Sequence, residues 1–312
     1  MASRALGWLV LVAARLVAWS YYLLPDFCQR LAAGIVGGVL RLARWRAEVV
    51  RQNLEIAFSG SDPQAVEQRE RIFRNFYRSF GHLVFEILMV LGPMKKFVTH
   101  SAEFRGIRHW QEAKAKGRGV IFLASHVGNW EVMAASGAHS GFDVLIVTKH
   151  LKPEWLHLAF EAGRRHCGVA GTYEPRTFRD VLKHLKSNGT VGIVLDQYAG
   201  PPVGVRVPFL GVPVGTQSAV AILAKRTGAV VLPVTSSRCE DGRFVCEVRP
   251  AVEWIPDESA EREIAINTAR YAQLLERDVL ANPEQWLWSH RRFKGDMGPL
   301  RPDEWTAGRT RR

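Results

Sequence analysis

The sequence predicts an α/β fold, in which a mostly parallel β-sheet is flanked by helices and preceded by a helical region and an N-terminal membrane helix. Two observations predict this arrangement. From Gly117 onward, short runs of β-branched and other apolar residues alternate with segments of helical period, a pattern typical of a parallel sheet covered on both faces. Before Gly117 the period is mainly helical, and residues 5–24 are almost wholly apolar.

The apolar segment at residues 5–24 contains one charged residue, Arg15, and is long enough to cross a bilayer or to lie within it. A shorter apolar run at 31–40 is followed by arginines that suit an anionic, cytoplasmic membrane surface. A cleaved signal peptide fits less well because Arg15 interrupts the apolar run, and a buried core helix is the other alternative. We predict that residues 1–40 form a membrane anchor that either spans the bilayer or is embedded in it.

Residues 41–116 are predicted to be a mainly helical lead-in to the core. Ser61 or Asp62 can cap a long helix with Pro63 at its first position, and Gly92-Pro93 ends this element. Apolar and aromatic residues recur along the helix at mostly helical spacing, so we expect this face to pack against the rest of the protein. They are Val66, Ile72, Phe73, Phe76, Phe80, Val84 and Ile87.

Residues 117–312 are predicted to form the α/β core, so that 41–312 make a single domain. The candidate strands are 120–124, 144–147, 191–195 and 230–234, and the candidate helices are 129–139, 153–167, 175–187 and 216–227. The stretch CEDGRFVCEV predicts an antiparallel hairpin with Asp241-Gly242 in its turn. A last amphipathic helix is expected at about 258–280.

The composition limits the partners that the chain can bind. Its formal net charge of +12 attracts phosphate, phospholipid head groups, nucleic acid or an acidic protein. No recognised nucleic-acid motif accompanies this charge, so we expect no nucleic-acid partner. The four cysteines are scattered, without CxxC or Cys/His zinc spacing, so we predict neither a disulfide framework nor a metal site.

The segment SHVGNWEVMAA places His126 directly after the first core strand and Glu131 five positions later. Ligands in open α/β sheets collect beyond the carboxyl ends of the strands, so His126 is placed like a catalytic residue. Five residues along a helix separate two side chains by too large an angle, so we expect His126 to precede the helix and fold back toward Glu131. Such a His–carboxylate dyad can remove a proton from a substrate hydroxyl.

The start of the following helix is a second candidate feature. If the helix begins near Gly128, the free backbone N–H groups of Gly128 and Asn129 would face the same cleft and favour developing negative charge. Other interpretations of His126 stay open. A zinc site lacks a third ligand nearby, Ser125 as a nucleophile lacks a GxSxG elbow, and a plain helix-capping histidine fits the spacing alone.

Several stretches, in order along the chain, resemble one protein family. The segment SHVGNWE is similar to the H-x4-(D/E) motif of the bacterial lipid A late acyltransferases, the lauroyl and myristoyl transferases, which belong to a wider glycerolipid acyltransferase-like set. Four further stretches between about residues 49 and 294 resemble motifs of the same family. They are VVRQNLEIAF, LDQYAG, VPFLGVPVGTQSAVAILAKRTGAVVLPV and PEQWLWSHRRFK.

This resemblance implies a glycerolipid acyltransferase-like domain at 41–312 that works without a cofactor. It implies transfer of a fatty acyl chain from an acyl carrier protein thioester to a hydroxyl of a lipid A precursor, at the cytoplasmic face of the bacterial inner membrane. His126 and Glu131 take the places of the family's catalytic pair. Asp196 and Arg164 match further family positions and are expected at the substrate; the alternatives are a turn cap for Asp196 and a solvated helix face for Arg164.

Two positions depart from the family pattern. Many relatives have an arginine before a proline where VTKHLKP places Lys149, and many have D-Q-D where this chain has Asp196-Gln197-Tyr198. Lysine cannot reproduce the bidentate fork of arginine, so we expect Lys149 to hold an anionic group of the acceptor differently. Arg291 and Arg292 are expected to brace the fold or to bind phosphate.

Two other functions stay open. One is a related acyltransferase that uses acyl-CoA and acylates another glycolipid or a lysophospholipid. The other is a non-catalytic membrane protein that binds anionic lipid, which the charge and the apolar N-terminus favour but which gives His126 no role.

Overall fold

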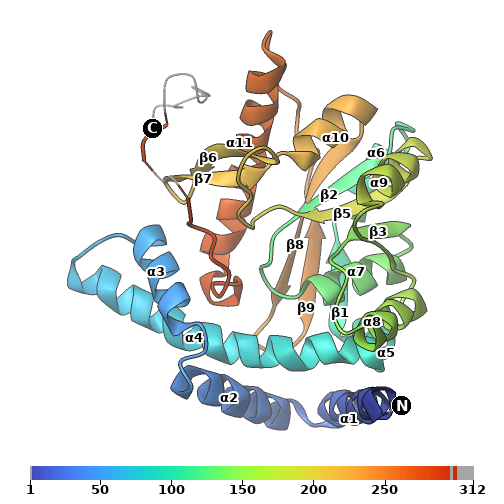
Figure 1. The fold of residues 1–312 in the computed structure, drawn as a ribbon, viewed down its shortest axis with the longest axis vertical. Coiled ribbons are helices and arrows are strands. Elements are labelled where there is room, and N and C mark those ends of the chain that lie inside the picture. The colour runs from blue at the N-terminus through green and yellow to red at the C-terminus, as the bar shows by residue number, and fades with distance from the viewer. Residues whose placement is uncertain (1, 296–297, 301–312) are drawn as a thin grey trace.

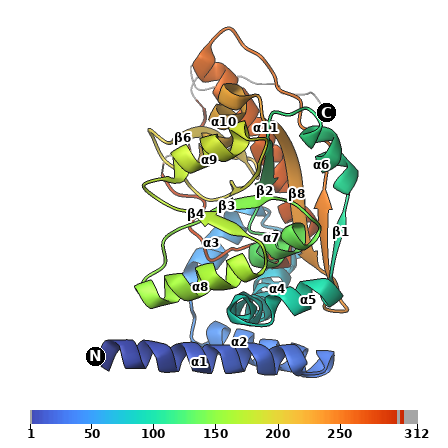
Figure 2. The same ribbon diagram turned by 90° about the vertical axis from the view of Figure 1, so that its right-hand side faces the viewer.

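The computed structural model describes residues 2–295 and 298–300, so residues 301–312 of the predicted core domain lie outside the described residues. A seven-stranded sheet runs through the body with helices on both faces (Figure 1, Figure 2). Its order is β1-β9-β8-β2-β5-β3-β4, and neighbouring strands are parallel except β8 and β9. The strands are β1 (Ala102–Arg105), β2 (Val120–Ala124), β3 (Val144–Val147), β4 (Ala170–Thr172), β5 (Thr190–Val194), β8 (Val230–Arg238) and β9 (Phe244–Val248).

Alternation along the central strand β2 divides the core between the two faces of the sheet. Ile121 and Leu123 belong to a cluster with α9 (Thr177–Lys186), α10 (Ala219–Thr227) and α11 (Ala260–Ala281). Phe122 belongs to a second cluster, which includes residues of α6 (Ile107–Lys114) and Met133 of α7 (Trp130–His139). A separate antiparallel hairpin, β6 (Gly204–Phe209) and β7 (Val212–Gln217), lies beside α11.

The N-terminal part of the chain is helical up to β1. Its elements are α1 (Ala2–Leu23), α2 (Asp26–Leu42), α3 (Ala47–Ala57), α4 (Pro63–Leu88), the short 3-10 helix η1 (Met89–Leu91) and α5 (Met94–Ser101). The predicted cap of the long helix is confirmed, because the Asp62 side chain accepts a hydrogen bond from the Ala65 N–H and Pro63 opens α4. Figure 1 shows α4 crossing the base of the body, with α1 and α2 outside it.

Among the described helices, α1 contains an apolar stretch, Leu6–Leu23, that is long enough to cross a membrane by length and composition. Little of this stretch is buried. The prediction of an apolar N-terminal helix is therefore confirmed, and the mode of attachment is a separate question.

Most of the predicted core elements are confirmed with small shifts. β2 and β3 have the predicted bounds, β5 begins one residue early, and the predicted hairpin is formed by β8 and β9 with Gly242 at a φ of +82°. The predicted helix 216–227 starts only at Ala219, because Thr216 and Gln217 pair in β7. β1 lies in the region predicted to be mainly helical, and β4, β6 and β7 were not predicted.

The helix between β3 and β4 completes the layer around the site. It is α8 (Glu154–His166), and it was predicted at 153–167. In Figure 2 it lies between α1 and the sheet.

Candidate active site

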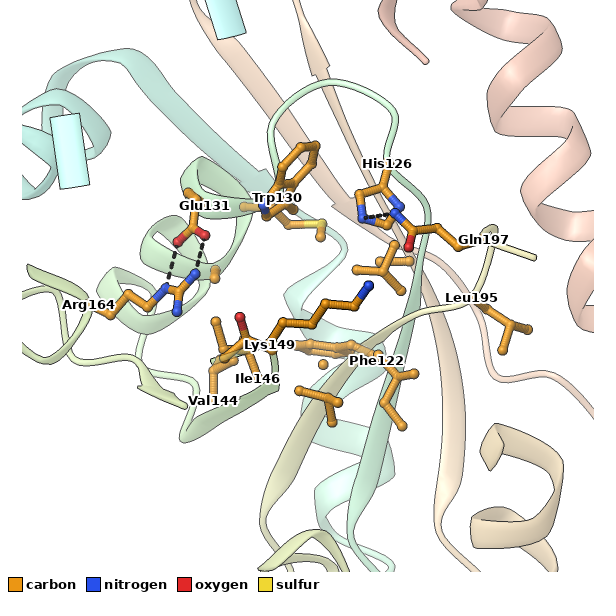
Figure 3. Close-up of a pocket in the computed structure, with 18 of the residues that line it drawn as sticks. Phe122, His126, Trp130, Glu131, Val144, Ile146, Lys149, Arg164, Leu195 and Gln197 are labelled. Carbon is orange, nitrogen blue, oxygen red and sulfur yellow. Dashed lines mark hydrogen bonds and ion pairs between the residues drawn. The ribbon is translucent and has the colours of Figure 1, made fainter. Parts of the chain in front are cut away.

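A cavity of about 750 Å³ lies between α7, α8 and one face of the sheet. Its floor comes from alternate residues of neighbouring strands, including Phe122 and Ala124 on β2 and Val144 and Ile146 on β3 (Figure 3). Further apolar lining comes from the helices and the strand ends: Ile87, Met133, Ala134, Leu151, Leu156, Phe160, Val194 and Leu195. The cavity is therefore suited to a long apolar group.

His126 lines this cavity from the loop between β2 and α7. Its Nδ1 lies 2.7 Å from Asp196 Oδ1, and its Nε2 lies 3.3 Å from the amide nitrogen of Gln197 (Figure 3). An ionised carboxylate can only accept, so Nδ1 carries the proton and Nε2 is the acceptor nitrogen. His126 thus has the tautomer that a general base needs, with its basic nitrogen next to a cavity-lining amide.

Asp196 is buried beneath His126 and has all its hydrogen bonds directed into the protein. Oδ2 accepts from the His126 backbone N–H at 2.7 Å and from the indole N–H of Trp286 at 2.6 Å. Burial acts to raise the pKa of Asp196, but the attraction to His126 and these hydrogen bonds outweigh it and lower that pKa. The carboxylate is therefore ionised at neutral pH and orients the imidazole.

Asp196 was expected at the substrate, and the structure places its side chain against His126 and outside the cavity lining. β2 and β5 are neighbours in the sheet, so the residues that follow them meet, and Asp196 lies under His126. Its partner Trp286 comes from the C-terminal PEQWLWSHRRFK stretch.

Glu131 does not contact His126, so the predicted hydrogen-bonded dyad is wrong. In the first turn of α7, Glu131 accepts two hydrogen bonds from Arg164 of α8, Nε at 3.0 Å and Nη2 at 2.6 Å. Figure 3 shows Trp130 between Glu131 and the His126 ring. The indole of Trp130 packs edge-on against the imidazole, with the ring centroids 4.8 Å apart. The helix directs Glu131 toward α8, whereas His126 turns toward β5.

Arg164 lines the cavity but is held by two buried carboxylates. Its Nη1 donates to Glu161 Oε1 at 2.9 Å, in addition to its two bonds to Glu131. Burial acts to lower the pKa of Arg164, but both glutamates oppose this and the net effect is to raise it. The alternative of a solvated helix face is wrong for Arg164, which is buried, whereas its neighbour Arg165 is exposed.

Gly128 does not offer the cavity the free N–H group that we expected, and neither Gly128 nor Asn129 lines the cavity. The Gly128 N–H donates to the Gln285 carbonyl at 3.1 Å, and a side chain at this position (φ +67°) would collide with the Ser236 carbonyl. Asn129 is fully buried and caps α7, accepting from the Glu131 and Val132 N–H groups while its amide donates to Glu86. Both residues shape the loop that holds His126.

Lys149 lines the cavity from the loop after β3, and its side chain is exposed. Figure 3 shows its ammonium group pointing toward His126 and Gln197. Within the part of the chain that the structure describes, no hydrogen bond or ion pair is recorded for this ammonium group. A cation therefore faces the same part of the cavity as the basic nitrogen of His126.

Gln197 and Trp286 belong to the site but were not among the predicted site residues. The LDQYAG and PEQWLWSHRRFK stretches contain them, yet neither residue type signals chemistry by itself. Arg292 was expected to brace the fold or bind phosphate, and the first is confirmed. It is completely buried and donates to the carbonyls of Gln197 (3.1 Å) and Gly215 (2.7 Å).

The alternatives to a general base find little support in this geometry. Within residues 2–295 and 298–300, no group of three or more His, Cys, Asp or Glu side chains is arranged to hold a metal ion. Ser125 is buried and does not line the cavity. The arrangement can instead deprotonate a hydroxyl beside an apolar chain.

Comparison of the chain with known proteins finds one family whose model matches most of its length. The model of the family described as bacterial lipid A biosynthesis acyltransferase matches residues 1–295. The chain is 26% identical to the lipid A biosynthesis lauroyltransferase of Escherichia coli (strain K12), over 89% of each chain. It is 25% identical to the palmitoleoyltransferase of the same strain, again over 89% of each chain. It is also 27% identical to a phosphatidylinositol mannoside acyltransferase of Mycobacterium tuberculosis (strain CDC 1551 / Oshkosh), over 63% of this chain and 61% of that protein.

Proposed function

The chain belongs to the bacterial lipid A biosynthesis acyltransferase family and is an acyltransferase, and we propose that it transfers a fatty acyl chain from acyl carrier protein to a hydroxyl of a lipid A precursor. The observation that carries this proposal is the acceptor nitrogen of His126 at the wall of an apolar cavity. A base beside an apolar cavity is what O-acylation by a fatty thioester requires.

His126 is the general base of the proposed reaction. Its Nε2 takes the proton of the acceptor hydroxyl while the hydroxyl oxygen bonds to the thioester carbonyl carbon. The carbon–sulfur bond then breaks, and the proton passes from Nε2 to the leaving thiolate, so the products are an ester and a free thiol. Asp196 orients the ring and stabilises the imidazolium that forms in between.

Polar groups near His126 are placed to stabilise the negative charge that develops on the carbonyl oxygen. The Gln197 amide nitrogen lies 3.3 Å from Nε2, and Lys149 points toward the same place (Figure 3). In this proposal Gln197 and Lys149 replace the Gly128 and Asn129 N–H groups as the donors. Glu131 acts indirectly, by fixing Arg164 in the cavity wall.

The partners follow from the same proposal. The acyl chain occupies the cavity next to Phe122, Val144 and Ile146. The net charge of +12 supports an acidic donor protein and an anionic acceptor. We place the enzyme at the inner membrane of a bacterial cell, with its catalytic domain facing the cytoplasm.

A second acceptor class is favoured by one observation, the similarity to a phosphatidylinositol mannoside acyltransferase. In this alternative the chain acylates another glycolipid or a lysophospholipid, with acyl-CoA as a donor. The chemistry of His126 is the same, so substrate supply distinguishes the two functions.

The test supplies the full-length protein in detergent with either acyl carrier protein that carries a fatty acyl thioester or acyl-CoA, and with each acceptor in turn. We expect mass spectrometry to detect the acylated lipid A precursor, together with stoichiometric free thiol, when acyl carrier protein is the donor. The His126→Ala protein is the control and should give neither. Transfer only to another lipid from acyl-CoA would favour the second function, and release of thiol without any ester would contradict both.

A further inference from the structure

The outer face of α1 is apolar and exposed. Leu9, Leu16 and Leu23 follow one another at seven-residue spacing, so they point in nearly the same direction, and they are 57–72% exposed. Exposed large apolar side chains are concentrated in residues 6–42 of the described chain, and only a few are scattered elsewhere. An apolar surface of this extent marks a site of contact with a partner or a membrane.

The opposite face of α1 is docked on the body along the length of the helix. Small and apolar residues form this stripe at three- and four-residue spacing: Gly7, Leu11, Ala14, Ala18 and Tyr21. At one end, a side chain on Gly7 would collide with Trp155 of α8. At the other end, the Tyr21 hydroxyl is hydrogen-bonded to His82 Nδ1 at 2.8 Å, and the Tyr21 ring stacks on Phe85 at 4.3 Å. The helix is thus fixed at both ends.

α2 repeats this two-faced arrangement. Its outer stripe is Phe27, Leu31, Ile35, Val39 and Leu42, each more than half exposed. Its inner stripe includes Ala33 and Gly37, which are buried against α4. A side chain at Gly37 would collide with the Tyr77 carbonyl of α4, and one at Gly81 would collide with the Ala33 carbonyl. Close backbone contact therefore fixes α2 to α4.

The two helices lie in one layer. Figure 1 shows α2 along its length below α4 and α1 nearly end-on, whereas Figure 2 shows α1 along its length on the same side of the molecule. Their axes therefore cross within a plane that forms one end of the molecule. The apolar stripes lie on the outer side of this plane, away from the body of the protein.

Arginines flank the outer stripes without entering them. Arg15, Arg30 and Arg41 each precede a stripe leucine by one residue, which places them about 100° around the helix from Leu16, Leu31 and Leu42. All three are exposed. An apolar face with arginines along its edges complements a leaflet that has acyl chains below and anionic head groups around the helix.

We propose that α1 and α2 lie together in the plane of one leaflet and that α1 does not cross the bilayer. A spanning α1 would have to leave its partners on α4 and α8, or take their charged residues into the hydrocarbon. In the plane, both stripes reach the acyl chains while Tyr21 and Gly7 keep their contacts. The proposal concerns attachment and is independent of the proposed reaction.

The first test determines on which side of the membrane the start of α1 lies. Cysteine is introduced as Ser3→Cys or, on the exposed surface of α11, as Glu261→Cys, with Cys28, Cys167 and Cys239 replaced by serine and the fully buried Cys246 kept. A membrane-impermeant maleimide is added to bacterial spheroplasts before and after lysis. We expect both sites to be labelled on the same side. Labelling of the two sites from opposite sides would overturn the proposal.

The second test asks whether α2 contributes. Leu31→Glu and Ile35→Glu place a carboxylate in the outer stripe, and Leu280→Glu on α11, at a site 52% exposed, is the matched control. Binding of the full-length protein to phosphatidylethanolamine–phosphatidylglycerol vesicles should weaken about tenfold or more for each α2 variant, because a charge must leave water, and should not change for the control. If the α2 variants bind vesicles as well as the wild type, or if they lose a dimer of this protein and not vesicle binding, the surface contacts another partner and the proposal is overturned.

Discussion

Asp196 and Glu131 are two buried carboxylates near the same cavity, and they have different kinds of partner. Asp196 accepts from a histidine ring, a backbone N–H and an indole. Glu131 accepts twice from Arg164, which also binds Glu161. The first carboxylate holds an imidazole whose second nitrogen can accept a proton, and the second holds a guanidinium, which has no acceptor atom.

This difference supports the proposal that His126 and Asp196, and not Glu131 and Arg164, carry out the proton transfer. The ring of His126 has one nitrogen bonded to Asp196 and the other directed to the cavity-lining Gln197, so a proton can be taken up. In the second cluster, one guanidinium faces two carboxylates within a buried wall. Such a cluster fixes α7 against α8, and in the proposed reaction the proton transfer is assigned to His126, with Asp196 as its orienting partner.

The largest expected effect is that of His126→Ala. Loss of a general base costs up to about ten-thousandfold in rate, so transfer should nearly cease while the circular dichroism spectrum and membrane binding stay those of the wild type. The measurement is the initial rate of ester formation. A rate within a few fold of the wild type would remove His126 from the mechanism, and the Asp196–His126 pair would then have no more chemical role than the Glu131–Arg164 cluster.

Asp196→Asn should have the next largest effect, about a thousandfold in kcat. Oδ2 faces two donors that cannot turn away, the His126 backbone N–H and the Trp286 indole. The asparagine oxygen must therefore take that place, and its NH2 group then faces Nδ1. This forces the ring proton onto Nε2, which is the wrong tautomer for a base.

Two measurements separate this effect from a general loss of structure. Asp196 does not line the cavity, so KM for the acceptor should stay nearly constant while kcat falls. Nitrogen-15 chemical shifts of His126 should report the changed tautomer. A rise in KM without a change in tautomer would contradict the orienting role.

The second cluster predicts coupling in stability. Arg164→Gln leaves two buried carboxylates without a cation and should destabilise the protein by about 3–5 kcal/mol, whereas Glu131→Gln leaves Arg164 paired with Glu161 and should cost less. In the double variant the loss should be smaller than the sum of the single losses, measured as the free energy of unfolding. The exposed Arg51–Glu70 pair is the matched control, with coupling of at most about 1 kcal/mol.

The same variants test the alternative role of Glu131. If Glu131 acts only through Arg164, the rate of Glu131→Gln should fall with its stability and should remain well above that of His126→Ala. A fully stable Glu131→Gln protein that is as inactive as His126→Ala would show that Glu131 acts at the reaction, and the two carboxylates would then share one function.

The sequence predicted the surroundings of His126 better than its partner. The runs at 120–124 and 144–147 are recognisable because strands buried on both faces are continuously apolar. Their order in the sheet is not a local property, so the adjacency of β2 and β5, which brings Asp196 to His126, could not be predicted from periodicity. The five-residue spacing to Glu131 was visible and misleading.

Short and unusual elements were also beyond local patterns. β1 (AEFR) and β4 (AGT) are short and, unlike the equally short β3 (VLIV), contain no continuous apolar run. They form strands by pairing with β9 and β3. The cap of α4 was predictable because Asp62 and Pro63 act within one turn. Arg164 could be named from the family pattern, but its partners Glu131 and Glu161 depend on the packing of α7 on α8.

Lys149 is the cation of the site that faces the cavity without either carboxylate, and its expected effect is the smallest. Lys149→Ala should weaken use of the acceptor by about tenfold, toward the lower end of a charge-assisted contact because the side chain is exposed. The reason is that Glu131 and Glu161 neutralise Arg164, whereas the Lys149 ammonium points toward His126 and Gln197. The measurement is kcat/KM for the acceptor, with thioester hydrolysis in its absence as the reference rate.

Lys149→Arg is the matched control and should keep activity, with a changed preference among phosphorylated acceptors because its planar fork reads phosphate geometry more strictly. Equal kinetics for wild type, Lys149→Ala and Lys149→Arg with several acceptors would mean that Lys149 only extends into solvent. Acceptor binding would then depend on the other side of the cavity, where Arg164 lies. The Arg164 cluster would in that case bind substrate and would not be only structural.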